Sequence, residues 1–141
     1  MTIDLRSDTV TKPTKAMLEA LFSAEVGDDV FGEDHTINKL EEKCAAMFGM
    51  EAGLFCSSGT QTNQVAIKLH TQPGDEVICD ANAHIYYYEG GGIAFNSGCS
   101  TKLLNGGRGQ FSAQDVESAI RADNVHFPST SLVAVENTHN I

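Results

Sequence analysis

Two short segments contain the residue types that could do chemistry. In the first, Ser57-Ser58-Gly59-Thr60 follows a short apolar run and precedes a stretch with helical spacing. Backbone N–H groups in the first turn of a helix lack intrahelical partners and carry partial positive charge, so such a turn can bind a phosphate group without a lysine. A helix N-cap without any ligand explains these residues equally well, because serine and threonine are preferred at that position.

The second segment, His84-Ile-Tyr-Tyr-Tyr-Glu89, follows a candidate buried strand and contains all three tyrosines of the chain. If the turn at Ser58 holds the phosphate of a flat heteroaromatic cofactor, His84 at the next strand end could stack on the cofactor ring. A structural hydrogen bond is the alternative role for His84. Glu89 could orient or deprotonate a neighbouring group, or it could be a solvated carboxylate.

Other chemistries have weaker support in the sequence. Zinc sites normally contain closely spaced ligand pairs such as HExxH, and the histidines of this chain are not paired in that way, so we expect no metal site. Cys56 or Ser58 could act as a nucleophile with a distant histidine, but neither lies in a nucleophile-elbow motif. The acidic loop at 28–34 lacks the ligand alternation of a calcium loop.

Composition indicates a globular chain that avoids polyanions. The 141 residues are 41% hydrophobic and 20% charged, which suits one domain with its own core. The net charge of −10 argues against binding to nucleic acid or to anionic membranes. The four cysteines form no CxxC pair and no apolar run is long enough to span a bilayer, so we expect a reducing, cytoplasmic location.

Hydrophobic periodicity and turn signals predict alternating helices and strands. We expect helices over 14–24, 36–48 and 60–69 and a fourth beginning with a Ser112/Asp115 capping box. We expect strands over 52–56, 76–79, 101–104 and 131–135, with glycine-rich loops at 90–92 and 105–109.

This alternation predicts an α/β fold whose sheet is mostly parallel and flanked by helices. In such sheets a ligand crevice lies beyond the carboxyl ends of the strands. Most of the polar and glycine-rich residues follow four predicted strand ends, at 57–60, 80–89, 105–109 and 136–139. The candidate phosphate turn and His84 are therefore expected to share one crevice.

Five segments in register resemble the amino-terminal part of the threonine aldolases. They are Ile3-Asp-Leu-Arg-Ser-Asp-Thr-Val-Thr11, Gly27-Asp-Asp-Val-Phe-Gly-Glu-Asp34, Ser58-Gly-Thr60, His84-Ile-Tyr-Tyr-Tyr-Glu89 and Glu136-Asn-Thr-His-Asn140. The resemblance implies an incomplete aspartate-aminotransferase-like (fold type I) large domain that binds pyridoxal 5'-phosphate (PLP). It also implies that residues 1–30 form an arm and helix at a subunit interface, and that residues 31–141 form the first, truncated part of the PLP-binding domain.

The resemblance further implies retro-aldol cleavage of L-threonine or L-allo-threonine to glycine and acetaldehyde. Carried across by motif, the cofactor-binding residues are Ser58, Gly59 and Thr60 on the phosphate and His84 on the pyridine ring. The implied substrate-binding residues are Ser7, Tyr88 and His126, and the implied catalytic residues are His84, His126 and Glu89. The base that takes the hydroxyl proton could be either imidazole or a water molecule.

The chain departs from the family pattern in two ways. Phe31 stands where a tyrosine is common. The family's Schiff-base lysine, its pyridine-facing aspartate and its carboxylate-binding arginines all lie beyond the segment equivalent to Ile141. We therefore expect a fragment of a longer enzyme that is inactive alone and that forms a homodimer or homotetramer when complete. A beta-eliminating lyase of the same superfamily and a non-catalytic fragment that binds partner subunits are the alternatives.

Overall fold

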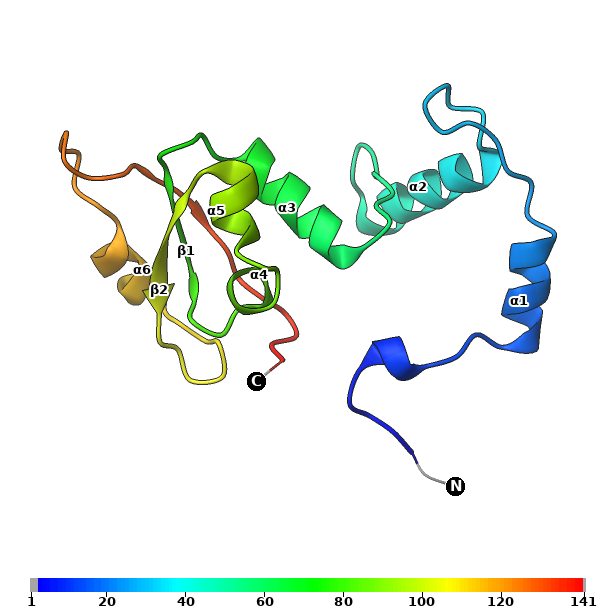
Figure 1. The fold of residues 1–141 in the computed structure, drawn as a ribbon, viewed down its shortest axis with the longest axis horizontal. Coiled ribbons are helices and arrows are strands. Elements are labelled where there is room, and N and C mark those ends of the chain that lie inside the picture. The colour runs from blue at the N-terminus through cyan, green and yellow to red at the C-terminus, as the bar shows by residue number, and fades with distance from the viewer. Residues whose placement is uncertain (1–2, 141) are drawn as a thin grey trace. The chain divides into compact units, whose positions relative to one another are not determined.

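The computed structural model describes residues 3–140, and the chain divides into two compact units, Met1–Phe55 and Cys56–Ile141 (Figure 1). The first unit contains the 3-10 helix η1 (Asp8–Val10) and the helices α1 (Lys15–Phe22) and α2 (His35–Phe48). The second contains α3 (Gly59–Leu69), β1 (Glu76–Asp80), α4 (His84–Tyr87), α5 (Gly92–Ser97), β2 (Ser100–Leu104), α6 (Ala113–Ala119) and β3 (Thr130–Val133).

Side-chain caps fix the two main helices of the first unit. Thr14 caps α1 by accepting a hydrogen bond from the Met17 N–H. Asp34 caps α2 by accepting from the N–H groups of Ile37 and Thr36. The hydrogen bonds from the backbone N–H groups of Ile37 and Gly27 are the main causes that hold the pKa of Asp34 below its usual value. The α2 helix ends at Gly49, whose φ of 65° is the left-handed conformation that favours glycine.

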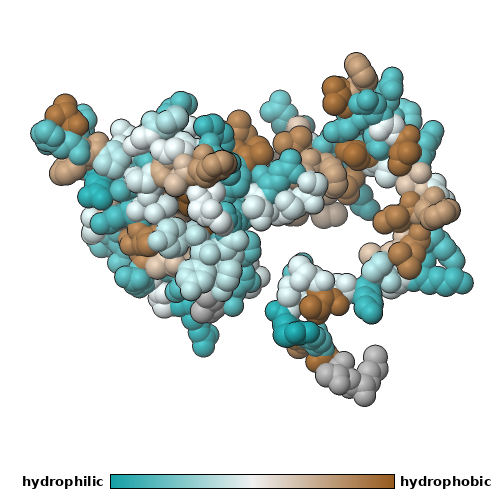
Figure 2. Space-filling view, viewed as in Figure 1, coloured by the Kyte–Doolittle hydropathy of each residue, from teal (hydrophilic) through white to brown (hydrophobic). Residues whose placement is uncertain are grey.

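The first unit leaves most of its apolar side chains exposed, and they gather on its surface as brown patches in Figure 2. No residue of α1 is buried, and Ala45 is the only buried residue of α2. Phe22, at the end of α1, is 94% exposed. Within residues 3–140, no helix is long and apolar enough to cross a bilayer.

The second unit is built on a three-stranded parallel sheet in the order β2-β1-β3. The central strand β1 is buried along its whole length. Ile67 of α3 and Ile93 of α5 pack with Val77 and Cys99 in a core against which Leu132 of β3 is also packed. The sheet, its parallel pairing and its flanking helices confirm the predicted α/β fold.

Seven predicted elements are confirmed with ends within two residues, and the Ser112/Asp115 capping box is present. The predicted strand over 52–56 is wrong, because that segment is irregular and no strand among residues 3–140 pairs with it. The short helix α5 was not predicted, since glycines 90–92 suggested a loop. The first residue of this helix is glycine, and a Cβ at that position would overlap the Gln64 side chain of α3.

Candidate active site

Parallel pairing brings the ends of all three strands to one edge of the sheet, and Asp80 lies at its centre. Asp80 ends β1 and is 2% exposed. Its Oδ2 accepts a hydrogen bond of 2.9 Å from the Gly106 N–H, in the loop after β2, and its Oδ1 lies 3.5 Å from Nε2 of His139, in the segment after β3. The expected convergence is therefore observed for three of the four predicted segments, whereas residues 57–60 follow no strand within residues 3–140.

His84 begins α4 at this edge, four residues after Asp80. The preceding residue, Ala83, offers no side-chain cap, and the His84 N–H instead donates a 2.5 Å hydrogen bond to Oε2 of Glu136. Glu136 follows β3 and is 52 residues away along the chain. Two neighbouring strand ends thus fix the start of the helix that carries the imidazole.

The Glu89 carboxylate joins α3 to the His84 ring. Its side chain is completely buried. Oε1 accepts from Asn63 Nδ2 at 2.7 Å and lies 3.0 Å from His84 Nδ1, while Oε2 accepts from Gln64 Nε2 at 2.6 Å. Because both amides lie on α3, this network holds His84 beside the helix that begins at Gly59.

Tyr88 lies beside the imidazole, as the aromatic cluster in the sequence suggested. The rings of His84 and Tyr88 are 5.5 Å apart between centroids and tilted by 42°. Tyr87 contacts Tyr88 edge to face at 4.9 Å. The His84 side chain remains 39% exposed, so part of its ring is available to a flat ligand.

The amino terminus of α3 has the geometry of a capped but open helix end. Ser58 is the N-cap, and its Oγ accepts from the Gln61 N–H at 3.1 Å. The hydroxyl proton of Ser58 and the first-turn N–H groups of Gly59 and Thr60 can point to a ligand, since those N–H groups have no acceptor within the helix. A Cβ built on Gly59 would meet no atom within 4 Å, so space is open above this turn.

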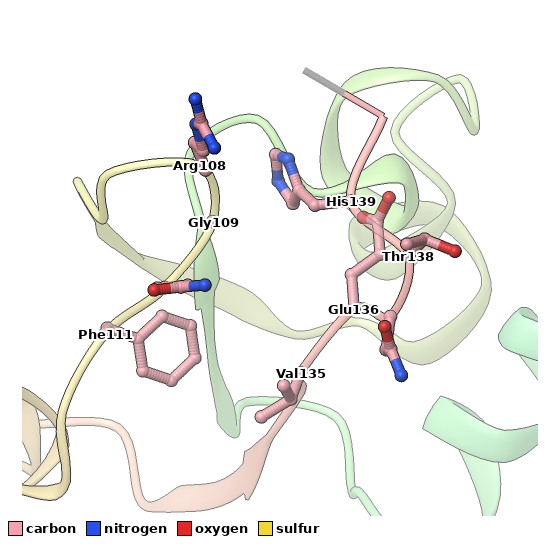
Figure 3. Close-up of a pocket in the computed structure, with 9 residues that line it drawn as sticks. Arg108, Gly109, Phe111, Val135, Glu136, Thr138 and His139 are labelled. Carbon is pink, nitrogen blue, oxygen red and sulfur yellow. The ribbon is translucent and has the colours of Figure 1, made fainter.

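A hollow of about 700 Å³ lies between the segments that follow β2 and β3. Figure 3 shows Arg108, Gly109 and Phe111 on one side and Val135, Glu136 and His139 on the other. Gly109 has a φ of 71°, and a Cβ at this position would overlap the His139 imidazole. Glycine is therefore required both by the backbone and by the close approach of His139.

His126 lies at the opposite edge of the sheet from His84. It is exposed in the loop between α6 and β3, where its N–H donates to Asn124 Oδ1 at 3.0 Å. Arg121 anchors the start of this loop to Glu76, the first residue of β1, through a 3.1 Å ion pair. Because β1 and β3 are parallel, the residues before β3 lie at the amino-terminal edge, so a single chain does not bring His126 and His84 together.

Ser7 belongs to the first unit, where it caps η1. Its Oγ accepts from the Thr9 N–H at 3.2 Å and lies 2.9 Å from Thr9 Oγ1. Its assignment to the substrate carboxylate stays a prediction. Within residues 3–140, His, Cys, Asp and Glu side chains do not gather in groups of three that could hold a metal ion.

Sequence reasoning missed Asn63, Gln64 and the capping role of Glu136. A signal for Gln64 was present, because it lies three residues before Ile67 on the buried face of α3. A polar side chain at such a position requires a partner, and the partner is Glu89. No comparable signal marks Glu136, whose contact with His84 depends on the pairing of β1 with β3.

Comparison with known proteins supports the resemblance seen in the sequence. The model of the beta-eliminating lyase family matches residues 4–141. A low-specificity L-threonine aldolase of Escherichia coli (strain K12) is 44% identical over 139 residues, which are 98% of this chain and 42% of that protein. Low-specificity L-threonine aldolase 1 of Arabidopsis thaliana is 47% identical over 141 residues, covering 97% of this chain and 39% of that protein.

Comparison with solved structures indicates the same relationship. The structure of the threonine aldolase from Leishmania major matches with a TM-score of 0.72 and 27% identity, over 88% of this chain and 36% of that one. The chain thus spans less than half the length of these relatives. Its sequence is matched by the family from residue 4 onward, and its parallel sheet and helices follow a threonine aldolase structure. The chain therefore belongs to the beta-eliminating lyase family and is homologous to the L-threonine aldolases.

Proposed function

We propose that this chain is the amino-terminal part of a PLP-dependent threonine aldolase, in which it binds the cofactor and shapes one side of the substrate pocket. The observation that carries the proposal is the hydrogen-bonded chain from Asn63 through Glu89 to His84. Asn63 lies four residues after Gly59, which is about 6 Å along a helix. The open helix end and the exposed imidazole ring would therefore bind two parts of the same cofactor.

The donor set at the helix end fits the phosphate of PLP. The Ser58 hydroxyl and the N–H groups of Gly59 and Thr60 are neutral donors, and the helix dipole adds partial positive charge. The Ser57 hydroxyl already donates to Gln61 Oε1 at 2.8 Å. A net charge of −10 disfavours anions generally, so a local site of this kind is needed to hold a phosphate. The open space at Gly59 allows the phosphate to approach the backbone.

His84 would hold the pyridine ring by stacking, with Glu89 and the Tyr88 ring fixing the imidazole in place. PLP supplies the electron sink that makes cleavage of the bond between the α and β carbons feasible. The residues of this chain would bind the substrate and accept the proton of its hydroxyl group. An imidazole is suited to that proton transfer near neutral pH.

Two predicted substrate residues need separate tests. Ser7 would bind the substrate carboxylate, and Ser7→Ala in the full-length protein should raise KM for threonine more than it lowers kcat. His126 would serve the site of a second subunit, because it lies at the edge of its own sheet away from His84. An inactive His84→Ala protein mixed with an inactive His126→Ala protein should then regain activity through shared sites.

We also propose that the arm and helix in residues 1–30 contact another copy of the chain. The support is that no residue of α1 is buried, and that the apolar side chains of Leu21 and Phe22 are 74% and 94% exposed. Apolar patches rimmed by polar residues are typical of subunit interfaces. Leu21→Glu should lower the molar mass of the full-length protein in sedimentation equilibrium, and an unchanged mass would exclude α1 from the interface.

The decisive experiment is expression of the full-length protein, followed by visible absorbance spectroscopy of the bound cofactor and product analysis. We expect PLP absorbance and release of acetaldehyde and glycine from threonine. Release of pyruvate from other amino acids in place of acetaldehyde would favour a beta-eliminating lyase. A protein that binds partner subunits but neither PLP nor threonine would support a non-catalytic role. The 141-residue chain by itself should be inactive.

A further inference from the structure

The buried Glu89 carboxylate accepts hydrogen bonds from two amides and contacts one imidazole nitrogen. Asn63 Nδ2 and His84 Nδ1 meet Oε1 at 2.7 and 3.0 Å, and Gln64 Nε2 meets Oε2 at 2.6 Å. The orientation of the Gln64 amide is fixed independently, because its Oε1 accepts from Asn96 Nδ2 of α5 at 3.1 Å. The Gln64 amide nitrogen must therefore face Glu89.

These donors determine the state of the carboxylate. Amide NH₂ groups only donate, so both oxygens of Glu89 act as acceptors, as in an ionised carboxylate. Hydrogen bonds from donors favour the charged form of a buried acid. An ionised Glu89 can accept a hydrogen bond from His84 only if Nδ1 carries a proton. Nε2 of the neutral imidazole is then the nitrogen with a free lone pair.

We propose that Asn63 and Gln64 are positioning residues that keep Glu89 ionised and thereby hold His84 as the Nδ1–H tautomer. This inference rests on the proposed function only where it concerns the reaction. There, it makes Nε2 the nitrogen of His84 that can accept a proton from the substrate hydroxyl. The role of Glu89 is to orient the imidazole, because its side chain is completely buried and its oxygens already have donors.

Close packing keeps Gln64 in this orientation. Gly92 begins α5 directly against the Gln64 side chain, where a Cβ would overlap it. Gln64 is 9% exposed, so its amide needs its protein partners. The contact between α3 and α5 therefore supports the hydrogen bond to Glu89 as well as the core.

The other groups around His84 are few. Glu136 accepts from the His84 N–H, and Tyr88 lies against the ring. The α5 sequence, GIAFNS, has no titratable side chain, and that of α3 has only Lys68, in its last turn. The charge nearest to the imidazole is thus that of Glu89, at 3.0 Å.

The test uses the full-length protein labelled with ¹⁵N-histidine. In the wild type, we expect His84 to show a protonated Nδ1 and an unprotonated Nε2 at pH above its pKa. Gln64→Met and Asn63→Leu each remove one amide donor from Glu89 and keep a side chain of similar size. With a donor lost, burial favours the protonated carboxyl group, which can donate to Nδ1, so neutral His84 should shift toward the Nε2–H tautomer in the ¹⁵N spectrum. The control, Gln114→Met, removes an amide on exposed α6 and should leave the His84 tautomer unchanged.

Cleavage kinetics provide a second measurement. If Nε2 accepts the hydroxyl proton, Gln64→Met should lower kcat/KM for threonine in proportion to the loss of the Nδ1–H tautomer. A purely structural role of Gln64 would lower activity without changing the tautomer. An Nε2–H tautomer in the wild type, or an Nδ1–H tautomer retained in both variants, would overturn the proposal. If the wild type neither binds PLP nor cleaves threonine, the proposed function fails, and the NMR measurements still decide the tautomer.

Discussion

The His84 N–H donates to the Glu136 carboxylate at 2.5 Å, and this bond joins the helix after β1 to the segment after β3. The α4 helix has no other side-chain cap, so Glu136 supplies the acceptor that its own sequence lacks. Glu136→Ala should lower the free energy of unfolding by about 1–2 kcal/mol, because the His84 N–H loses its charged acceptor. Urea denaturation of the full-length protein measures this.

Glu136→Gln is the matched variant, because its amide oxygen can still accept from His84. It should retain a large part of the stability lost in Glu136→Ala. Equal stability of the alanine variant and the wild type would show that the cap contributes nothing.

Replacing His84 separates its stacking from its hydrogen bond. His84→Ala should weaken PLP binding by about 1–3 kcal/mol, because an aromatic contact and a hydrogen bond are lost together. His84→Phe keeps a flat ring and should recover much of the affinity, while threonine cleavage stays low because no ring nitrogen remains. Equilibrium titration with PLP and steady-state kinetics test the two parts. Unchanged affinity in His84→Ala would refute stacking.

Two glycines give opposite expectations for the same substitution. A Cβ on Gly59 meets no protein atom within 4 Å, so Gly59→Ala should not destabilise the fold. It should weaken PLP binding, because the methyl group occupies space above the phosphate-binding turn. PLP titration together with thermal unfolding checks this prediction. Full PLP affinity in Gly59→Ala would place the phosphate elsewhere.

Gly92→Ala provides the contrasting case. Its Cβ would overlap the Gln64 side chain, so the substitution should cost about 1–3 kcal/mol of stability through overpacking. It should also disturb the hydrogen bond from Gln64 to Glu89. A Gly92→Ala protein with wild-type stability would show that the Gln64 amide can move aside without cost.

Burial of the Cys79 thiol should make the second unit less stable at alkaline pH. Burial, together with the charge of neighbouring Asp80, raises the pKa of Cys79 from 9.0 to about 11. The folded state therefore keeps the thiol neutral while the unfolded state ionises. The contribution is fully present below about pH 9 and is lost as pH rises from about 9 to about 11, at about 1.4 kcal/mol per unit.

Cys79→Ala isolates this effect from other groups that titrate at alkaline pH. The difference in unfolding free energy between wild type and Cys79→Ala should shrink between pH 9 and 11. Thiol labelling offers an independent check, since Cys44 is exposed and Cys79 is buried. Rapid labelling of Cys79 in the native protein would contradict the raised pKa.

Much of the fold was predictable because it depends on local patterns. Helical periodicity located α2 and α3, and the Ser112/Asp115 pair identified the start of α6. The strand predicted over 52–56 failed because an apolar run becomes a strand only where another strand pairs with it. The α5 helix was missed because its glycine-rich start has a tertiary cause, the contact of Gly92 with Gln64.

The sequence by itself determined the α/β class, the resemblance to the threonine aldolases and the candidates at Ser58, His84 and Glu89, since each depends on residue types at short spacing. Only the tertiary structure decided which distant groups meet. It joined Asn63 and Gln64 to Glu89, and Glu136 to the His84 N–H. It also separated His126 from His84. The physical reason is that parallel strands gather their carboxyl ends at one edge, whatever the length of chain between them.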